Sequence, residues 1–163
     1  MGKETELTGC ISGSFKFKPG IDSLIDEFRD LGARILSPEK GWVTLPHHRL
    51  LRLPHPEFRP LPTEQGVTIR GIEDNFLRSV AHSDFLYVAN FEGYTGQSTN
   101  LEIGFAFSKG IPVFSVVRMK NDEYGDLWLG DILEQIKNAT PTEVVNEIRN
   151  KKEQEKSDQE KVS

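Results

Sequence analysis

The chain has 163 residues, a formal net charge of −5 and one cysteine, Cys10. This length suits a single domain with its own core, and the acidic balance argues against a general binder of nucleic acids or membrane surfaces. One cysteine excludes an intrachain disulfide and a thiolate-rich zinc site. No apolar run approaches the ~20 residues that cross a bilayer, and the polar residues 1–6 do not fit a secretory signal, so a cytoplasmic protein is expected.

A β-α-β unit is predicted at the beginning of the chain, with residues 7–11 as its first strand and 33–36 as its second. Between them, after Gly20, apolar residues recur at the spacing of an amphipathic helix: Ile21, Leu24, Ile25, Phe28 and Leu31. Gly32 is expected to end this helix in the left-handed conformation. The two strands should therefore be parallel and joined by a right-handed crossover.

The segment 37–68 contains six of the nine prolines and three of the four histidines. Proline at this density excludes a regular helix or a central strand, and apolar residues such as Trp42 favour a packed cover over disorder. The adjacent histidines His47 and His48 point in different directions, and neither they nor His55 have a carboxylate pair at ligand spacing. We therefore predict no metal site.

Regular structure resumes after this cover. The predicted elements are a helix at 69–81, a strand at 85–89, an apolar helix that ends near 109–110, a strand at 111–117 and a helix near 129–136. Thr142 is expected to cap a last helix, and the charged tail at 151–163 is expected to be solvated helix or disorder. Strands that alternate with helices predict one α/β domain over 1–150 with a parallel sheet, flavodoxin-like or Rossmann-like.

The loop between the strand at 85–89 and the following helix is the candidate ligand site. It runs from Asn90 through Gly93, Tyr94 and Gly96, and open α/β sheets bind ligands in such loops. Free backbone amides before a helix can hold a phosphate, but the loop lacks the lysine of a P-loop. The turn at 12–15 should lie beside it, because both follow strands that meet at the point where the strand order reverses.

Glu102 allows two interpretations. Thr99 and Glu102 have the spacing of a capping box, in which the glutamate serves only the helix start. Alternatively, the carboxylate faces the crevice and acts as a nucleophile or stabilises an oxocarbenium-like centre. Leu101, Phe105 and Ala106 are expected to point into the core from the same helix.

Four segments, 11–15, 36–38, 83–88 and 101–106, together resemble the nucleoside 2-deoxyribosyltransferase superfamily, most specifically in Glu-Ile-Gly-Phe-Ala at 102–106. The resemblance implies a flavodoxin-like fold with about five parallel strands. It also implies that Glu102 attacks C1′ of a nucleoside or nucleotide and breaks the N-glycosidic bond without a cofactor. The expected partners are this small molecule and further copies of the chain, as a homodimer or higher homo-oligomer.

The resemblance further implies substrate-binding residues: Gly13, Ser14, Phe15, Asn90, Gly93, Gly96 and Ser98. Gly96 stands where transferases carry an aspartate for the sugar 5′-hydroxyl, and Ser98 resembles the small hydroxyl residues of hydrolases that act on nucleoside 5′-monophosphates. Tyr94 is expected to replace a family tyrosine that assists the glutamate. Because another family aspartate falls at Phe76, a catalytically inactive nucleotide-binding or sensing module stays an alternative.

Overall fold

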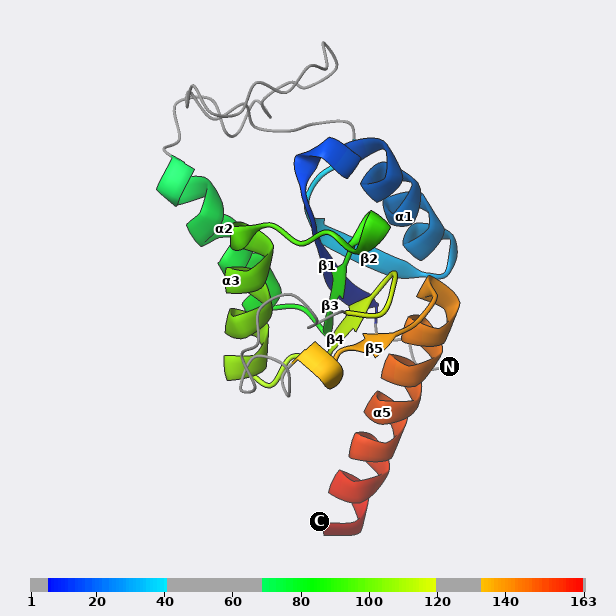
Figure 1. Cartoon of the computed structure of the whole chain (residues 1–163). Helices are drawn as coiled ribbons and strands as arrows, with labels where there is room; N and C mark the ends of the chain where they lie inside the picture. Colours follow the sequence, from blue (N-terminus) through cyan, green and yellow to red (C-terminus); the bar gives the residue numbers. More distant parts are fainter. Residues whose placement is uncertain (1–5, 41–68, 120–132, 163) are drawn as a thin grey trace.

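A five-stranded, all-parallel sheet forms the centre of the computed structural model, which describes residues 6–40, 69–119 and 133–162 (Figure 1). Its strands are β1 (Leu7–Ser12), β2 (Ala33–Ser37), β3 (Phe85–Val88), β4 (Val113–Ser115) and β5 (Lys137–Asn138). They lie in the order β2-β1-β3-β4-β5, and every neighbouring pair is parallel. The predicted parallel sheet of about five strands is confirmed.

Helices cover both faces of this sheet (Figure 1). Helices α1 (Lys18–Asp30) and α5 (Pro141–Val162) pack on one face, and α2 (Ile69–Ala81) and α3 (Gln97–Ser108) pack on the other. The three layers make the predicted flavodoxin-like or Rossmann-like α/β architecture. The segment 41–68, which holds most of the predicted cover, and the segment 120–132 lie outside the described residues.

The central strands β1, β3 and β4 are buried on both sides, so their apolar residues divide between two cores. In β3, Phe85 and Tyr87 join the core beneath α1 and α5, whereas Leu86 and Val88 join the core beneath α2 and α3. This division follows from the two-residue period of a strand, which sends successive side chains to opposite faces. A nearly continuous apolar run is therefore what the centre of this sheet requires.

The carboxyl ends of β1 and β3 lie side by side, as predicted for the point where the strand order reverses. The Ala89 N–H donates a hydrogen bond of 2.7 Å to the Ser12 carbonyl. A Cβ added to Gly13 would lie 3.0 Å from the Ala89 carbonyl oxygen, so the two loops are in close contact. Ligands of open α/β sheets bind at this position.

Two helix boundaries differ from the predictions. Helix α1 begins at Lys18, before Gly20, because Pro19 fits a first helical turn. The last helix is capped by Thr140 and not by Thr142: Thr140 and Glu143 exchange backbone-to-side-chain hydrogen bonds in a capping box. That helix continues to Val162, so the described part of the charged tail is solvated helix.

The prediction of a helix near 129–136 is wrong at the C-terminal end of that range. Its described part is helical only at Leu133 and Glu134, and the chain then enters β5. Strand β5 was missed because it has two exposed residues, Lys137 and Asn138, and so lacks an apolar signal. Gly32, by contrast, has the predicted left-handed backbone, with φ of 83°.

Because β1 packs closely against β3, one methyl group added at Gly9 should destabilise the folded protein. A Cβ on Gly9 would overlap the ring of Phe85, its partner in the parallel register. We expect Gly9→Ala to lower the free energy of unfolding by about 1–3 kcal/mol through overpacking, measured by urea unfolding at low protein concentration. The matched control is Gly104→Ala, whose Cβ would meet nothing within 4 Å; equal stability of both variants would contradict the packing.

Candidate active site

The side chain of Glu102 is buried within the fold and does not cap its helix. Helix α3 begins at Gln97 with Gly96 as its N-cap, so Glu102 lies in the second helical turn. The predicted capping box with Thr99 is therefore wrong, because Thr99 itself is inside the helix. The side chain of Glu102 is on the inner side of α3, and the residue is only 7% exposed.

Ser12 supplies the first contact of the Glu102 carboxyl group. Its hydroxyl donates a hydrogen bond to Glu102 Oε2. Ser12 is the last residue of β1 and is itself buried, and its carbonyl accepts the Ala89 N–H described above. The donor is therefore fixed by the sheet and oriented toward α3.

Glu73 supplies the second contact from the neighbouring helix α2. The carboxyl groups of Glu73 and Glu102 are within hydrogen-bonding reach of each other. The Oε1 atom of Glu73 is buried, and among the described residues it meets no hydrogen-bond donor. Two ionised carboxylates can only accept, so a hydrogen bond between them requires a proton on one of them. The contact is explained by one shared proton.

The electrostatic surroundings favour this protonated state. Burial is the main cause that raises the pKa of Glu102 to about 8, and the charge and hydrogen bond of Glu73 raise it further, against the lowering effect of the Ser12 hydroxyl. Burial also raises the pKa of Glu73, and the charge of Asp74 adds to this, whereas the hydrogen bond with Glu102 lowers it. At neutral pH the pair therefore holds a proton, and its titration belongs to the two groups together.

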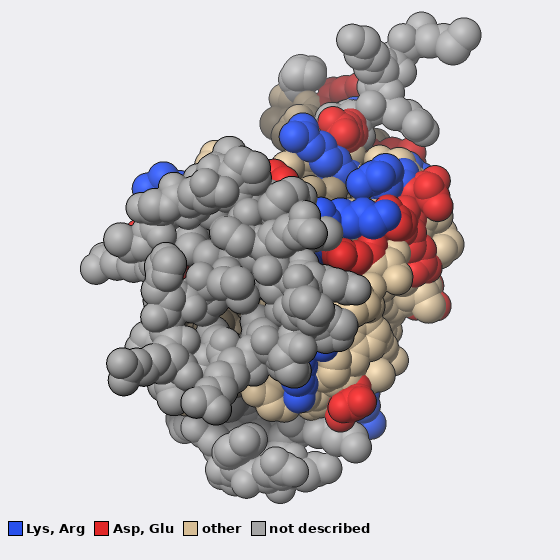
Figure 2. All heavy atoms as spheres, turned by 90° about the horizontal axis from the view of Figure 1, so that it is seen from above, with Lys and Arg blue, Asp and Glu red and all other residues tan. Residues whose placement is uncertain are grey.

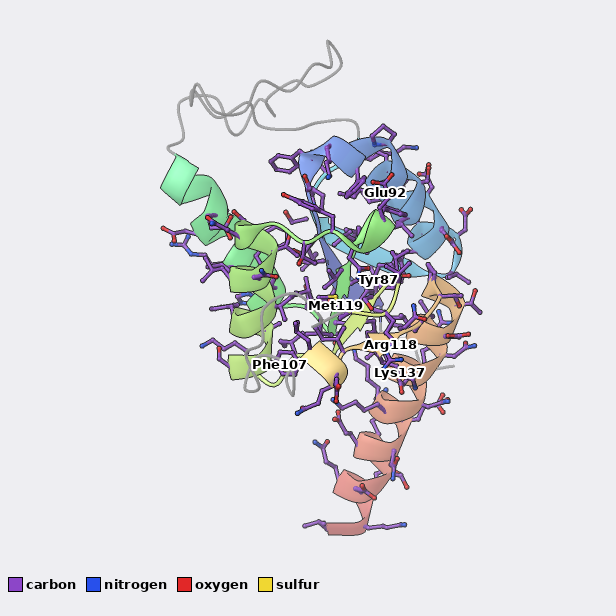
Figure 3. The ribbon with its side chains drawn as sticks, in the orientation of Figure 1. Tyr87, Glu92, Phe107, Arg118, Met119 and Lys137 are labelled. Carbon is purple, nitrogen blue, oxygen red and sulfur yellow. The ribbon has the colours of Figure 1, made fainter. Side chains whose placement is uncertain are left out.

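Asn90, predicted to bind substrate, makes its side-chain hydrogen bonds within the fold. It is almost completely buried, and its amide donates to the Val117 carbonyl at 2.9 Å and to Met119 Sδ at 3.1 Å (Met119 is labelled in Figure 3). Its Oδ1 accepts the Val117 N–H at 3.0 Å. The side chain joins the end of β3 to the segment after β4, so Asn90 holds these two segments together.

The other predicted residues lie along the loops that follow β1 and β3. Ser14 accepts a hydrogen bond from the Lys16 N–H and begins the short helix η1 (Phe15–Phe17). Gly93 has a left-handed φ of 77° and ends the helix η3 (Phe91–Gly93). Gly96 is the N-cap of α3 and has no side chain with which to cap it, and Ser98 is exposed in the first turn. Within the described ranges, no side chain accepts a hydrogen bond from the first backbone amides of this helix.

Tyr94 belongs to the rim of this edge and not to the carboxyl pair. It is 46% exposed, and its ring packs edge-on against Phe17 with the Lys16 ammonium 3.6 Å from the ring centre. Among the described residues, the Glu102 carboxyl is contacted by Ser12 and Glu73. The hydroxyl group that contacts Glu102 therefore comes from Ser12 and not from Tyr94.

Glu73 was missed as a site residue, and the contact of Ser12 with Glu102 was not predicted, although the turn at 12–15 was placed beside the loop. For Glu73 a signal existed: Glu73, Phe76 and Val80 are spaced i, i+3 and i+7, so the glutamate shares the inward face of a helix with two core residues. A carboxylate on an apolar face indicates a specific partner. Ser12 gave a weaker signal, because a serine that ends a strand is commonly part of a turn.

Comparison of this chain with protein-family models and with curated proteins gives no match.

Within the described ranges, there is no group of three or more His, Cys, Asp or Glu side chains that could hold a metal ion. His47, His48 and His55 lie outside those ranges. None of the helices in the described part is long and apolar enough to span a membrane. Seen from above, Lys and Arg lie close to Asp and Glu on the coloured part of the surface (Figure 2).

The raised pKa of Glu102 predicts how stability depends on pH. The unfolded state loses this proton near the ordinary value of 4.5, whereas the folded state keeps it up to about pH 8. Between these values the folded state binds more protons, so the free energy of unfolding falls as pH rises, by at most about 1.4 kcal/mol per pH unit. Glu102→Gln cannot ionise and should remove this fall, measured by urea unfolding across the same pH range.

The matched control is Glu153→Gln, at an exposed position of α5, which should keep the wild-type pH dependence. If the wild type and Glu102→Gln gave parallel stability curves, Glu102 would have an ordinary pKa and the shared proton would be excluded.

Proposed function

We propose that this chain cleaves the N-glycosidic bond of a nucleoside or nucleotide, with Glu102 as the nucleophile. This is the activity that the resemblance to the nucleoside 2-deoxyribosyltransferase superfamily implies. The observation that supports it most is the buried Glu102 carboxyl, held by Ser12 and paired with Glu73 beside the point where the strand order reverses. Enzymes that cleave glycosidic bonds through a covalent intermediate commonly use one carboxylate as the nucleophile and a second carboxyl group as the acid and base.

The proposed reaction uses the two carboxyl groups in different roles. Glu102, as the carboxylate, attacks C1′ and forms an ester bond while the bond from C1′ to the base nitrogen breaks. The electron pair of that bond goes to the leaving base, which takes the shared proton from Glu73. Water or a second base then attacks C1′ from the opposite side, returns a proton to Glu73 and releases Glu102, so configuration at C1′ is retained.

The 5′ end of the substrate is proposed to bind at the start of α3. The backbone amides between Gly93 and Gly96, the Ser98 hydroxyl and the positive end of the helix dipole suit an anionic group. Lys16 adds a cation on the rim, since its ammonium lies over the ring of Tyr94. These features support a nucleoside 5′-monophosphate as the substrate, with Gly13, Ser14 and Phe15 beside the sugar and base.

One observation favours a second candidate, a nucleotide-binding or sensing module without catalysis. The pKa of Glu102 is raised above neutrality, and a protonated carboxyl group is a poor nucleophile. In the enzyme, bound substrate would have to separate the pair and leave the proton on Glu73. In the sensing module, the pair would stay protonated and serve only as hydrogen-bonding groups.

The proposed activity is tested by measuring, with chromatography, the release of the base from a panel of nucleosides and nucleoside 5′-monophosphates. We expect release from at least one 5′-monophosphate and a loss of kcat of about 10³-fold or more in Glu102→Gln, because the amide cannot form the ester. Glu153→Gln is the control and should keep the wild-type rate.

Thermal unfolding with the same panel distinguishes the two candidates. If a nucleotide stabilises the protein without being cleaved, and if Glu102→Gln keeps this stabilisation, the sensing module would be favoured over the enzyme. No cleavage and no stabilisation across the panel would contradict both.

If Glu73 supplies the proton, the effect of Glu73→Gln on kcat should depend on whether the leaving base needs protonation. We expect Glu73→Gln to lower kcat by about 10²–10⁴-fold for ordinary substrates, the usual contribution of general acid catalysis. A 7-methylguanine nucleotide leaves without protonation, so its cleavage should be reduced far less. Steady-state rates on both substrate types measure this difference; an equal loss on both would show that Glu73 does not supply the proton.

A further inference from the structure

A cavity of about 570 Å³ lies at the amino-terminal edge of the sheet, opposite to the edge that holds the carboxyl pair. Its lining includes Ile111 and Pro112, which directly precede β4, and Phe107 near the end of α3 (Phe107 is labelled in Figure 3). The volume is within the range of cavities that hold small ligands, about 300–1,000 Å³. We call this space the β4-edge cavity.

One side of the β4-edge cavity is apolar. Its floor is formed by side chains that are buried: Val113, Phe114 and Ile148. Phe107, Ile111 and Pro112 also line it, and these three residues are only partly buried. A ligand with an apolar body would cover them and remove this surface from water.

The other side of the cavity is polar and belongs to helix α5. Glu147, Asn150, Lys151 and Gln154 are spaced i, i+3, i+4 and i+7, so they lie along one side of this helix. They reach the cavity because α5 continues past the edge of the sheet (Figure 1). A ligand between the two sides would therefore meet apolar groups on one side and hydrogen-bonding groups on the other.

Contacts with the rest of the fold hold α5 beside the cavity. The Arg149 guanidinium donates a hydrogen bond of 2.9 Å to the Leu31 carbonyl. The Lys152 ammonium lies 2.9 Å from the Asp84 carboxylate. The polar side of the cavity is thus positioned before any ligand binds, which lowers the entropic cost of binding.

The charges around the cavity favour a single negative charge on the ligand. Lys137 Nζ lies 2.7 Å from Glu147 Oε1, so these two charges compensate each other (Lys137 is labelled in Figure 3). Lys151 forms no ion pair within the described ranges and adds one positive charge. The amides of Asn150 and Gln154 are further donors beside it. A phosphate dianion would face Glu147 without a second free cation, whereas one carboxylate matches Lys151.

We propose that the β4-edge cavity binds a small monocarboxylate with an apolar body, aromatic or alkyl. The body packs on Phe107, Ile111 and Pro112, and the carboxylate accepts a charge-assisted hydrogen bond from Lys151. The cavity shares no residue with the carboxyl pair or with the loops that follow β1 and β3. The proposal therefore does not depend on the proposed function.

NMR of the backbone amides of the full chain, titrated with 2-naphthoate and with octanoate, tests the proposal. We expect at least one of these carboxylates to shift the resonances of residues around the cavity, such as Ile111 and Lys151, with a Kd of about 1 mM or lower. The neutral amide of the same compound should bind about fivefold more weakly, because it lacks the charge that Lys151 attracts.

Two variants separate the roles of charge and space. Lys151→Gln should weaken binding of the carboxylate about fivefold and leave binding of the neutral amide unchanged. The matched control is Lys161→Gln, which makes the same change at an exposed position near the end of α5 and should keep the wild-type affinity. Asn150→Trp, also at an exposed position, should fill the cavity and abolish binding of both compounds.

The proposal would be overturned if neither carboxylate shifted the resonances around the cavity at concentrations up to about 10 mM. Equal affinities for a carboxylate and its neutral amide, or an affinity that Lys151→Gln leaves unchanged, would also overturn it. So would shifts confined to the loops after β1 and β3, because the anion would then bind at the other edge of the sheet.

Discussion

Two carboxyl groups in contact cannot both be ionised without a cost, because each faces the charge of the other and burial removes part of their hydration. Glu102 is buried and Glu73 is half-buried, and a shared proton is the arrangement that gives both a hydrogen-bonding partner. Ser12 opposes full protonation by donating to Glu102. The balance among these three groups determines the charge of the site, the pH dependence of stability and the chemistry that the glutamate can perform.

The sheet brings these groups together from three separate elements. Ser12 ends β1, while Glu73 and Glu102 project inward from α2 and α3, which pack side by side on one face. Because β1 and β3 are neighbours, the loops that follow them meet at the same edge. Asn90 then fixes the end of β3 to the segment after β4. The fold therefore holds the carboxyl pair between the end of β1 and two helices.

The α/β class and the parallel sheet were predictable because buried strands and amphipathic helices have different apolar periods. Strand β5 was not, since two exposed residues carry no such period. Glu102 was found from its segment, but its surroundings were not: the sequence spacing favoured a capping box, whereas the helix begins at Gln97 and sends the side chain inward. Leu101 was predicted to point into the core but is exposed. The apolar character of a helical residue does not by itself show that another part of the chain covers it. Contacts between Ser12, Glu73 and Glu102 span up to 90 positions of sequence, and single-chain periodicity holds no information about them.

The most direct test of the shared proton is an NMR titration of the glutamate side-chain carboxyl carbons, in the wild type and in Glu73→Gln. We predict that Glu102 stays protonated well above the ordinary value of 4.5. We also predict that removing the Glu73 carboxylate lowers its midpoint, since the charge of Glu73 is one cause of the shift. Titration of Glu102 near 4.5 in the wild type, unchanged in Glu73→Gln, would contradict the account.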